Sequence, residues 1–391
     1  MFTRSSPPPF LVFGAPHIGE AEIDEVVATL RSGWLGTGPR VARFEAAFAA
    51  YKGVAPAQAL GLSSCSAGLH LALLAAGIGP GDEVITTPLT FCATINAILH
   101  VGATPVLADI DPLTLNLDPG DVARKLTAKT RALLPVHFAG RGCAMGELLR
   151  IAEAHDLRVI EDCAHAIETL IDGKPAGTLG DFGSFSFYAT KNLTTGEGGM
   201  LLGRDEALLH KSRALSLHGV SKDAFMRREA EQFLPYDVVG AGYKYNMMDL
   251  QAALGLHQLA EVGENHKKRA FIWQRYREAI EELPLAGPPA LPTGPDRHGL
   301  HLFTVQVSPE RAGLSRDELA ARLRVAGIGT GVHYTSLADF PYYQERCGFH
   351  PEQVPHATRV SRHILSLPLS AHLSAEEVTR VIGSLREALM P

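Results

Sequence analysis

Between about residues 55 and 205, short apolar segments alternate with segments that have the apolar spacing of helices. Strands are predicted over 82–87, 104–110, 131–138 and 157–162, and helices over 94–102, 119–127 and 145–156. Repeated strand–helix–strand order requires right-handed crossovers, so it predicts an α/β fold with a mostly parallel sheet and helices on both faces. Ligands of such sheets bind beyond the carboxyl ends of the strands, so functional residues are expected there.

The pattern changes after residue 205. Helices are predicted over 207–219, 247–262 and 264–283, followed by a proline-rich linker or strand edge over 284–295. The pattern of the tail, in the segments 301–307, 316–328, 329–334 and 374–389, is typical of a small α+β domain. A chain of 391 residues exceeds one small core, so we expect a large α/β domain over 1–255, with an N-terminal arm, and a smaller domain over 256–391.

Charge and cysteine usage exclude several classes of protein. The net charge of −6 argues against a nucleic-acid partner, and the basic cluster of Lys267, Lys268 and Arg269 is interpreted as a solvated helix face. The scattered cysteines are typical of free thiols in a reducing cytoplasm and indicate no disulfide frame and no metal site: Cys65, Cys92, Cys143, Cys163 and Cys347. We expect a cytoplasmic protein without a membrane segment, because no apolar run approaches the roughly 20 residues that cross a bilayer and the start lacks a signal-peptide pattern.

Two features fall at the predicted ligand-binding edge of the sheet. Asp162 ends a predicted strand, where it either caps a loop or acts as a buried carboxylate for a cationic ring nitrogen such as the pyridinium of pyridoxal phosphate. The residues Ser63 to Ser66 precede a helical segment. Their hydroxyls and free N–H groups suit a phosphate, although the same pattern also fits a plain serine N-cap.

Lys191 follows the alternating stretch SFSFYAT and precedes the glycine cluster GEGG. Alone it is either a solvated loop cation or an amine beside a cavity. A desolvated amine has a lowered pKa and can attack an aldehyde to form a Schiff base. Together with a phosphate site and an acid at the same edge, Lys191 becomes the predicted nucleophile.

Four segments resemble the DegT/DnrJ/EryC1/StrS group of sugar aminotransferases: EDCAHA (161–166), GDFGSFSFYATKNLTTGEGGML (180–201), GYKYNMMDLQAALGLHQL (242–259) and GVHY (331–334). The resemblance starts near GAPHIGEAEI and extends nearly to the end of the chain. It implies a fold type I enzyme that depends on pyridoxal phosphate.

The resemblance also implies roles for individual residues around the cofactor. Lys191 corresponds to the lysine that forms the Schiff base, and Asp162 to the acid that pairs with the pyridine nitrogen. His165 stands where many relatives have a glutamine that hydrogen-bonds near the phenolic oxygen of the cofactor. Phe91 corresponds to an aromatic residue that stacks on the ring, with a core phenylalanine as the alternative. The phosphate would be bound by Ser186, by Ser66 and by the backbone around Ala67, where Cys65-Ser66 replaces a common Gly-Thr pair.

Further residues correspond to partner-subunit and substrate contacts. Either Asn246 or Lys244 reaches the phosphate of the neighbouring subunit, which implies a homodimer with a shared site. His333 and Tyr334 correspond to substrate-side residues, although the pair could simply end a strand. Arg227 and Arg228 could bind a diphosphate or form a solvated pair.

The implied reaction moves an amino group from L-glutamate to a nucleotide-linked 4-keto-6-deoxyhexose. A 3-keto sugar or a keto-cyclitol is the alternative acceptor. Some family members are dehydratases with histidine in place of the lysine, and Lys191 argues against that activity.

Overall fold

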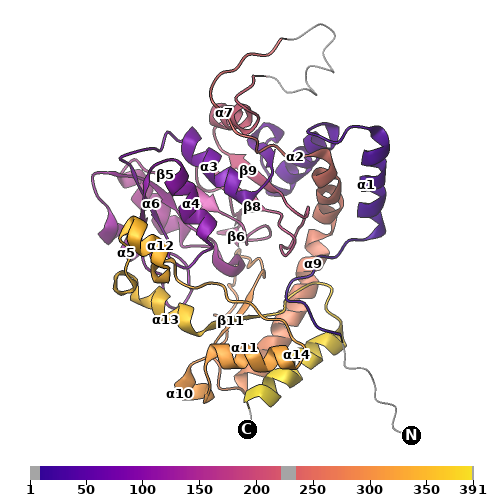
Figure 1. Cartoon of the computed structure of the whole chain (residues 1–391), viewed down its shortest axis with the longest axis vertical. Helices are drawn as coiled ribbons and strands as arrows, with labels where there is room; N and C mark the ends of the chain where they lie inside the picture. Colours follow the sequence, from indigo (N-terminus) through magenta and orange to yellow (C-terminus); the bar gives the residue numbers. More distant parts are fainter. Residues whose placement is uncertain (1–8, 222–234, 390–391) are drawn as a thin grey trace.

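The predicted parallel sheet is present in the computed structural model, which describes residues 9–221 and 235–389 (Figure 1). Its seven strands run in the order β1-β9-β8-β5-β4-β2-β3. They are β1 (Ala59–Leu62), β2 (Glu83–Thr86), β3 (Thr104–Leu107), β4 (Thr130–Leu134), β5 (Arg158–Asp162), β8 (Phe182–Ser186) and β9 (Gly199–Gly203). Strand β9 is antiparallel to both of its neighbours and the other pairs are parallel, so the expected mostly parallel α/β fold is confirmed.

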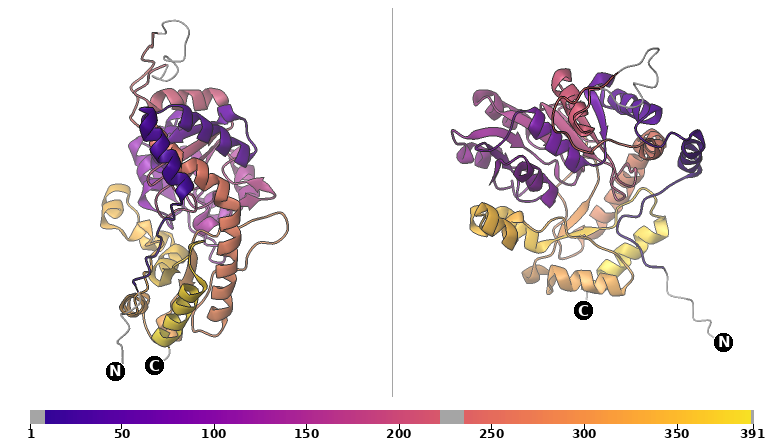
Figure 2. Two further views of the ribbon diagram at one scale, coloured as in Figure 1. Left: turned by 90° about the vertical axis from the view of Figure 1, so that its right-hand side faces the viewer. Right: turned by 45° about the horizontal axis from the view of Figure 1, so that its top comes forward.

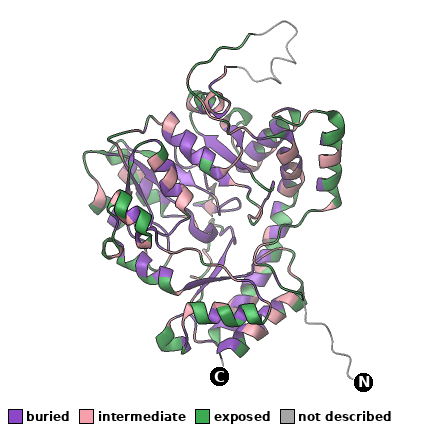
Figure 3. Cartoon of the chain, in the orientation of Figure 1, coloured by how far each residue is buried: buried purple, intermediate pink, exposed green. Residues whose placement is uncertain are grey.

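Helices cover both faces of this sheet. Successive buried residues of a strand point to opposite faces, and each face needs helices to shield its apolar side chains from water. Ala132 and Leu134 pack on one side with α3 (Cys65–Ala75), α4 (Cys92–His100) and α7 (Glu206–Ser216). Leu133 packs on the other, where the helices are α2 (Pro39–Lys52), α5 (Pro119–Lys125), α6 (Met145–Ala154) and α9 (Asp249–Glu281). Helix α1 (Glu20–Ser32) lies outside α9, and its outer surface is largely exposed (Figure 3).

The C-terminal part lies below the sheet in Figure 1 and is built on a two-stranded antiparallel ladder of β10 (Phe303–Gln306) and β11 (Ile364–Leu367). Its helices are α10 (Pro309–Ala312), α11 (Arg316–Val325), α12 (Pro341–Cys347), α13 (Pro355–His363) and α14 (Ala375–Leu389). Strands β6 (Leu170–Ile171) and β7 (Lys174–Pro175) form a small separate hairpin. Short 3-10 helices lie at Pro56–Gln58, Phe138–Gly140, Leu337–Asp339 and Pro351–Gln353.

Helix α9 corrects one prediction. The two helices predicted over 247–262 and 264–283 are a single helix, Asp249–Glu281, which passes through Gly263 without interruption. A glycine in a helix costs only about 1 kcal/mol and this one has no proline or cap beside it, so it does not end the helix. The helix runs from the sheet into the C-terminal part (Figure 2) and crosses the proposed boundary between residues 255 and 256, so that division stays a proposal.

The N-terminal segment packs on the C-terminal part. Leu11 N donates to Gly327 O and Gly329 N donates to Leu11 O, both at 2.8 Å, and the Leu11 side chain is buried in the same hydrophobic cluster as β10 and α14. No helix within residues 9–221 and 235–389 combines the length and apolar character that crossing a bilayer requires.

Candidate active site

A cavity of about 610 Å³ lies where several strands of the sheet end. Asp162 closes β5 and Ser186 closes β8, while Cys65 follows β1 and Phe91 follows β2. Of the residues predicted for the site, the cavity is lined by Cys65, Ser66, Phe91, Asp162, His165, Ser186, Lys191, His333 and Tyr334. Residues from four loops and from the C-terminal part therefore converge as the strand-end rule predicts.

Lys191 lies in the turn after β8, where its N–H donates to Tyr188 O at 2.9 Å. Removal from water lowers the pKa of its amine to about 8, although the neighbouring Cys65 and Asp162 act in the opposite direction. The Nζ atom has no hydrogen-bond partner among the described side chains and backbone groups. This lysine is thus an available amine at a cavity wall and not a solvated loop cation.

Asp162 is buried and holds its carboxylate in a fixed orientation. Thr94 Oγ1 donates to Oδ2 at 2.9 Å and Ala164 N donates to Oδ1 at 3.1 Å. Burial raises the pKa of this carboxyl, with Thr94, Ala164 and Lys191 opposing the rise. The Cys65 thiol is a second, weaker donor to Oδ1, with its Sγ at 3.9 Å. A carboxylate oxygen can accept two hydrogen bonds, so Oδ2 retains capacity for a further donor from the cavity.

The start of α3 confirms the serine N-cap, while phosphate binding by the serine cluster stays a prediction. Ser64 is the N-cap, and its Oγ accepts from Ala67 N at 3.1 Å, so the N–H of Ala67 already has a partner. Ser66 is exposed to the cavity. A side chain at Gly199 would place its Cβ 2.5 Å from the Ser64 carbonyl carbon, so the glycine allows β9 to lie directly against this loop.

Phe91 is 60% exposed and lies at the cavity, so it is not a core phenylalanine. Cys65 is buried, with its Sγ 3.3 Å from Ser184 Oγ and 3.9 Å from Asp162 Oδ1. Burial raises the pKa of the Cys65 thiol well above its usual range, so the thiol stays protonated.

His165, His333 and Tyr334 also line the cavity, and the ring of Tyr334 lies 6.3 Å from that of Phe91 between centroids. His165 is buried and lies 3.0 Å from the Tyr334 hydroxyl, measured from Nε2. His333 Nδ1 lies 2.9 Å from Ser366 Oγ on β11, which anchors it to the C-terminal part. Burial and the positive charge of Lys191 lower the pKa of His333 to about 4, so this imidazole is neutral at physiological pH.

Lys244 and Asn246 do not line this cavity. Lys244 Nζ donates to Asn246 Oδ1, and Asn246 Nδ2 donates to Thr37 Oγ1, both at 2.7 Å. Asn246 instead borders a separate cavity of about 290 Å³ beside Arg213. A role at a neighbouring subunit stays a prediction for either residue, and Arg227 and Arg228 lie outside the described residues.

One buried cation was interpreted wrongly from the sequence. Arg269, taken as part of a solvated face, is buried and forms an ion pair with Glu168, while its neighbour Lys267 is exposed. Asn192, next to the predicted nucleophile, donates to Glu168 Oε2 at 3.0 Å and to Gly299 O at 2.8 Å. The sequence did contain an indication that Arg269 is buried. Its helical spacing from the apolar residues Ile272, Trp273 and Tyr276 places the arginine on the buried face of the helix.

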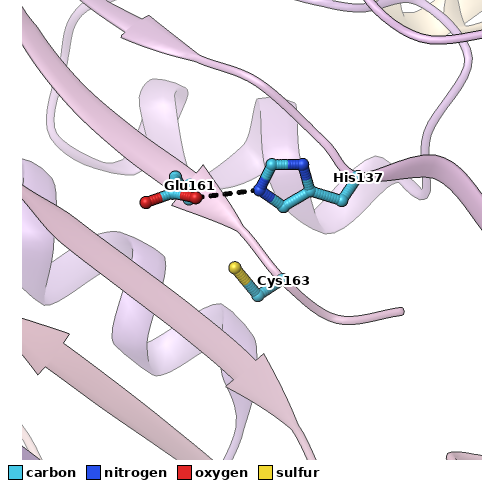
Figure 4. Close-up of side chains that lie close together, drawn as sticks. All are labelled: His137, Glu161 and Cys163. Carbon is cyan, nitrogen blue, oxygen red and sulfur yellow. Dashed lines mark hydrogen bonds and ion pairs between the residues drawn. The ribbon is translucent and has the colours of Figure 1, made fainter. Parts of the chain in front are cut away.

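A second buried cluster, His137, Glu161 and Cys163, has the spacing of a metal site (Figure 4). The imidazole nitrogens of His137 and the carboxylate oxygens of Glu161 already have hydrogen-bond partners. Cys143 N donates to His137 Nδ1 at 3.1 Å, so Nε2 carries the proton that faces Glu161 Oε2 at 3.0 Å. Glu161 also accepts from the backbone N–H groups of Gly177, Leu179 and Gly180. The imidazole has no free lone pair for a metal, and the cluster fixes the 177–180 loop to β5.

The residues of the main cavity fit pyridoxal phosphate. A buried carboxylate with spare acceptor capacity suits a protonated ring nitrogen, a desolvated amine suits an aldehyde, and a helix N-terminus with nearby hydroxyls suits a phosphate. The volume of about 610 Å³ lies within the range of small-molecule sites.

Comparison with known proteins gives a consistent result. The profile of the DegT/DnrJ/EryC1/StrS aminotransferase family matches residues 16–386. The chain is 47% identical over 380 residues to "Spore coat polysaccharide biosynthesis protein SpsC" of Bacillus subtilis, covering 97% of each chain. It is similar to the crystal structure of an aminotransferase, TlmJ, from Streptoalloteichus hindustanus, with 34% identity, a TM-score of 0.88 and coverage of 97% and 98%. The putative sugar aminotransferase Spr1654 from Streptococcus pneumoniae in its PMP-form gives 34% identity and a TM-score of 0.89, again covering 97% and 98%.

Proposed function

Because this chain belongs to the DegT/DnrJ/EryC1/StrS family, it is a sugar aminotransferase that uses pyridoxal phosphate, and we propose that its acceptor is a nucleotide-linked 4-keto-6-deoxyhexose with L-glutamate as donor. The observation that carries the chemistry is the meeting of Lys191 and Asp162 in one cavity. The name of the relative SpsC refers to polysaccharide biosynthesis, which generally draws on nucleotide-activated sugars, and this supports the nucleotide linkage.

When bound, pyridoxal phosphate supplies an aldehyde for amines and a ring that withdraws electrons. Asp162 would hold a proton on the ring nitrogen, because a buried carboxylate strongly favours a cationic partner. Lys191 would remove the proton from the α-carbon of the donor as general base in the first half of the reaction. In the second half it would act as general acid and deliver a proton to the acceptor carbon that gains the amino group. A pKa of about 8 places its amine near neutrality, where it can do both.

The walls of the cavity suit an acceptor with a sugar ring. Phe91 and Tyr188 are 60% and 47% exposed and offer aromatic faces, and His333 offers a neutral polar edge. We propose that a homodimer completes the site, with Asn246 or Lys244 reaching the phosphate in the partner subunit. The exposed position of Lys244 supports this contact.

The test is an assay of the purified protein with glutamate and a panel of nucleotide keto-sugars, with release of 2-oxoglutarate as the readout. The protein should be yellow and should lose its colour on borohydride reduction. Lys191→Ala should abolish both the reducible colour and the transfer. The matched control is Lys174→Ala, which removes an exposed lysine on the β6–β7 hairpin and should leave both unchanged.

Each outcome separates the alternatives. Turnover only with a 3-keto sugar or a keto-cyclitol replaces the proposed acceptor, and loss of substrate hydroxyl without glutamate consumption indicates a dehydratase. Normal transfer by Lys191→Ala would show that another group is the nucleophile.

A further inference from the structure

Both ring nitrogens of His165 are engaged inside the protein. Ala139 N lies 3.3 Å from Nδ1, and the Tyr334 hydroxyl lies 3.0 Å from Nε2. The resemblance predicted that this imidazole itself hydrogen-bonds near the phenolic oxygen of the cofactor. With two partners already present, His165 has no ring nitrogen left for that contact.

The direction of each hydrogen bond follows from its donor. A backbone N–H can only donate, so Nδ1 of His165 is an acceptor and the proton of the neutral imidazole is on Nε2. That proton points at the oxygen of Tyr334, which therefore accepts. The hydroxyl proton of Tyr334 must point elsewhere, and no other described group accepts it.

The surroundings keep both side chains neutral. Burial lowers the pKa of His165 well below its usual value, and the charges of Lys191, His301 and His333 add to the effect. Burial also raises the pKa of Tyr334, with Asp162 and Cys92 acting in the same direction. A second proton on His165 or a lost proton on Tyr334 would break the arrangement, so it persists across the physiological range.

The backbone that holds His165 is itself constrained. Ala139 has a positive φ of 56° in the turn after β4, and Gly140 follows with a φ of 97°. A Cβ at Gly140 would lie 3.0 Å from the backbone of Gly299, so only glycine fits there. The Phe138 ring packs edge-on against Tyr334 at 6.4 Å between centroids, so one turn supports both partners of the hydrogen bond.

We propose that Tyr334 donates a hydrogen bond from its hydroxyl to the phenolic oxygen of pyridoxal phosphate. His165 is then a positioning residue that orients this hydroxyl. Tyr334 lines the same cavity as Lys191 and Asp162. The proposal rests on the cofactor lying between those two residues and not on the identity of the acceptor sugar.

The first test is an absorbance titration of the yellow holoenzyme without substrates. The phenolic oxygen of the lysine-linked cofactor becomes more negative when the imine nitrogen loses its proton. A hydrogen-bond donor to that oxygen stabilises the deprotonated form. Tyr334→Phe should therefore raise the pH midpoint of the colour change, by about one to two pH units for a hydrogen bond to a charged group. The control is Tyr343→Phe, which removes a hydroxyl that donates to Asn96 Oδ1 outside the cavity and should leave the midpoint unchanged.

The second test separates positioning from direct contact. His165→Phe should raise the midpoint in the native background but add nothing to Tyr334→Phe, because it acts through the tyrosine. His165→Gln should keep a nearly native midpoint, since an amide can accept from Ala139 and donate to Tyr334.

Specific results would overturn the proposal. A shift by His165→Phe that persists in the Tyr334→Phe background would show that the imidazole contacts the cofactor directly. An unchanged midpoint in Tyr334→Phe, with a raised KM for the keto-sugar, would make Tyr334 a substrate contact. Absence of the reducible yellow colour from the native protein would instead refute the proposed function.

Discussion

The amine of Lys191 acquires its reactivity from its position, since leaving water costs a charged ammonium more than a neutral amine. The neighbouring Asp162 limits that effect because its negative charge favours the protonated form. The predicted importance of both residues came from their sequence context at strand ends. The burial of both residues, and the pKa of about 8 that burial gives Lys191, required the folded chain.

Capture of pyridoxal phosphate by the apoprotein should depend on pH with a midpoint near 8. Only the neutral amine attacks the aldehyde, so the rate should rise about tenfold per pH unit below the midpoint and level off above it. Stopped-flow absorbance measures this rate. Asp162→Asn should lower the midpoint, because the neutral amide no longer favours the ammonium. A midpoint near 10.4, the ordinary lysine value, would contradict burial of the amine.

His165 shows how far residue-level reasoning reaches. Its position in EDCAHA predicted a place beside the cofactor, and the structure puts it at the cavity. Its hydrogen bonds to Ala139 and Tyr334 join segments 26 and 169 residues away in the chain. No local sequence pattern identifies partners at these separations, so the tautomer of the imidazole could not be predicted from the sequence.

Among the elements, strands β2 to β5 and helices α4 to α6 were predicted because each has a clear apolar period and a breaker at its ends. Helix α9 was predicted as two helices, because Gly263 was interpreted as the boundary between them. Gly263 lies on an open surface, where an added Cβ would meet nothing within 4 Å, so neither packing nor a cap ends the helix there. Local patterns therefore located elements better than they located ends.

Two serine N-caps allow a matched comparison between elements. Ser64 caps α3 at the cavity, and Ser315 caps α11 in the C-terminal part by accepting from Glu318 N at 3.2 Å. Replacing either by alanine should cost about 1 kcal/mol of stability in urea unfolding. Only Ser64→Ala should also change the affinity of the apoprotein for pyridoxal phosphate, because the first turn of α3 faces the proposed phosphate site. Equal affinities in the two variants would place the phosphate elsewhere.

At the scale of the whole molecule, Glu168 joins the sheet region to the C-terminal part. Its carboxylate receives Arg269 from α9 and the amide of Asn192 beside the nucleophile, while its backbone oxygen accepts from Arg297 at 2.6 Å. Arg269 and Arg297 lie 101 and 129 residues from Glu168 in the chain. The helical spacing of Arg269 could have indicated its burial, but its partner Glu168 is revealed only by the complete fold.

Arg269→Met should destabilise the protein by about 3–5 kcal/mol, because it leaves a buried carboxylate without its cation. The double variant Glu168→Gln with Arg269→Met should recover most of this loss, since the neutral glutamine still accepts from Asn192. Urea unfolding of the apoprotein measures both. If the double variant is no more stable than Arg269→Met alone, lost packing of the arginine stem and not the unpaired charge is the cause.

The 33 residues of α9 form one rod about 50 Å long that is shared by both parts of the molecule. An unbroken helix offers no pivot, so the C-terminal part is expected to keep a constant spacing from the sheet throughout turnover. The width of the cavity between the sheet and the C-terminal part then stays constant, and an acceptor is selected by whether it fits that width. A change of acceptor would come from exchanging side chains at the rim of this opening, and not from a new swinging motion.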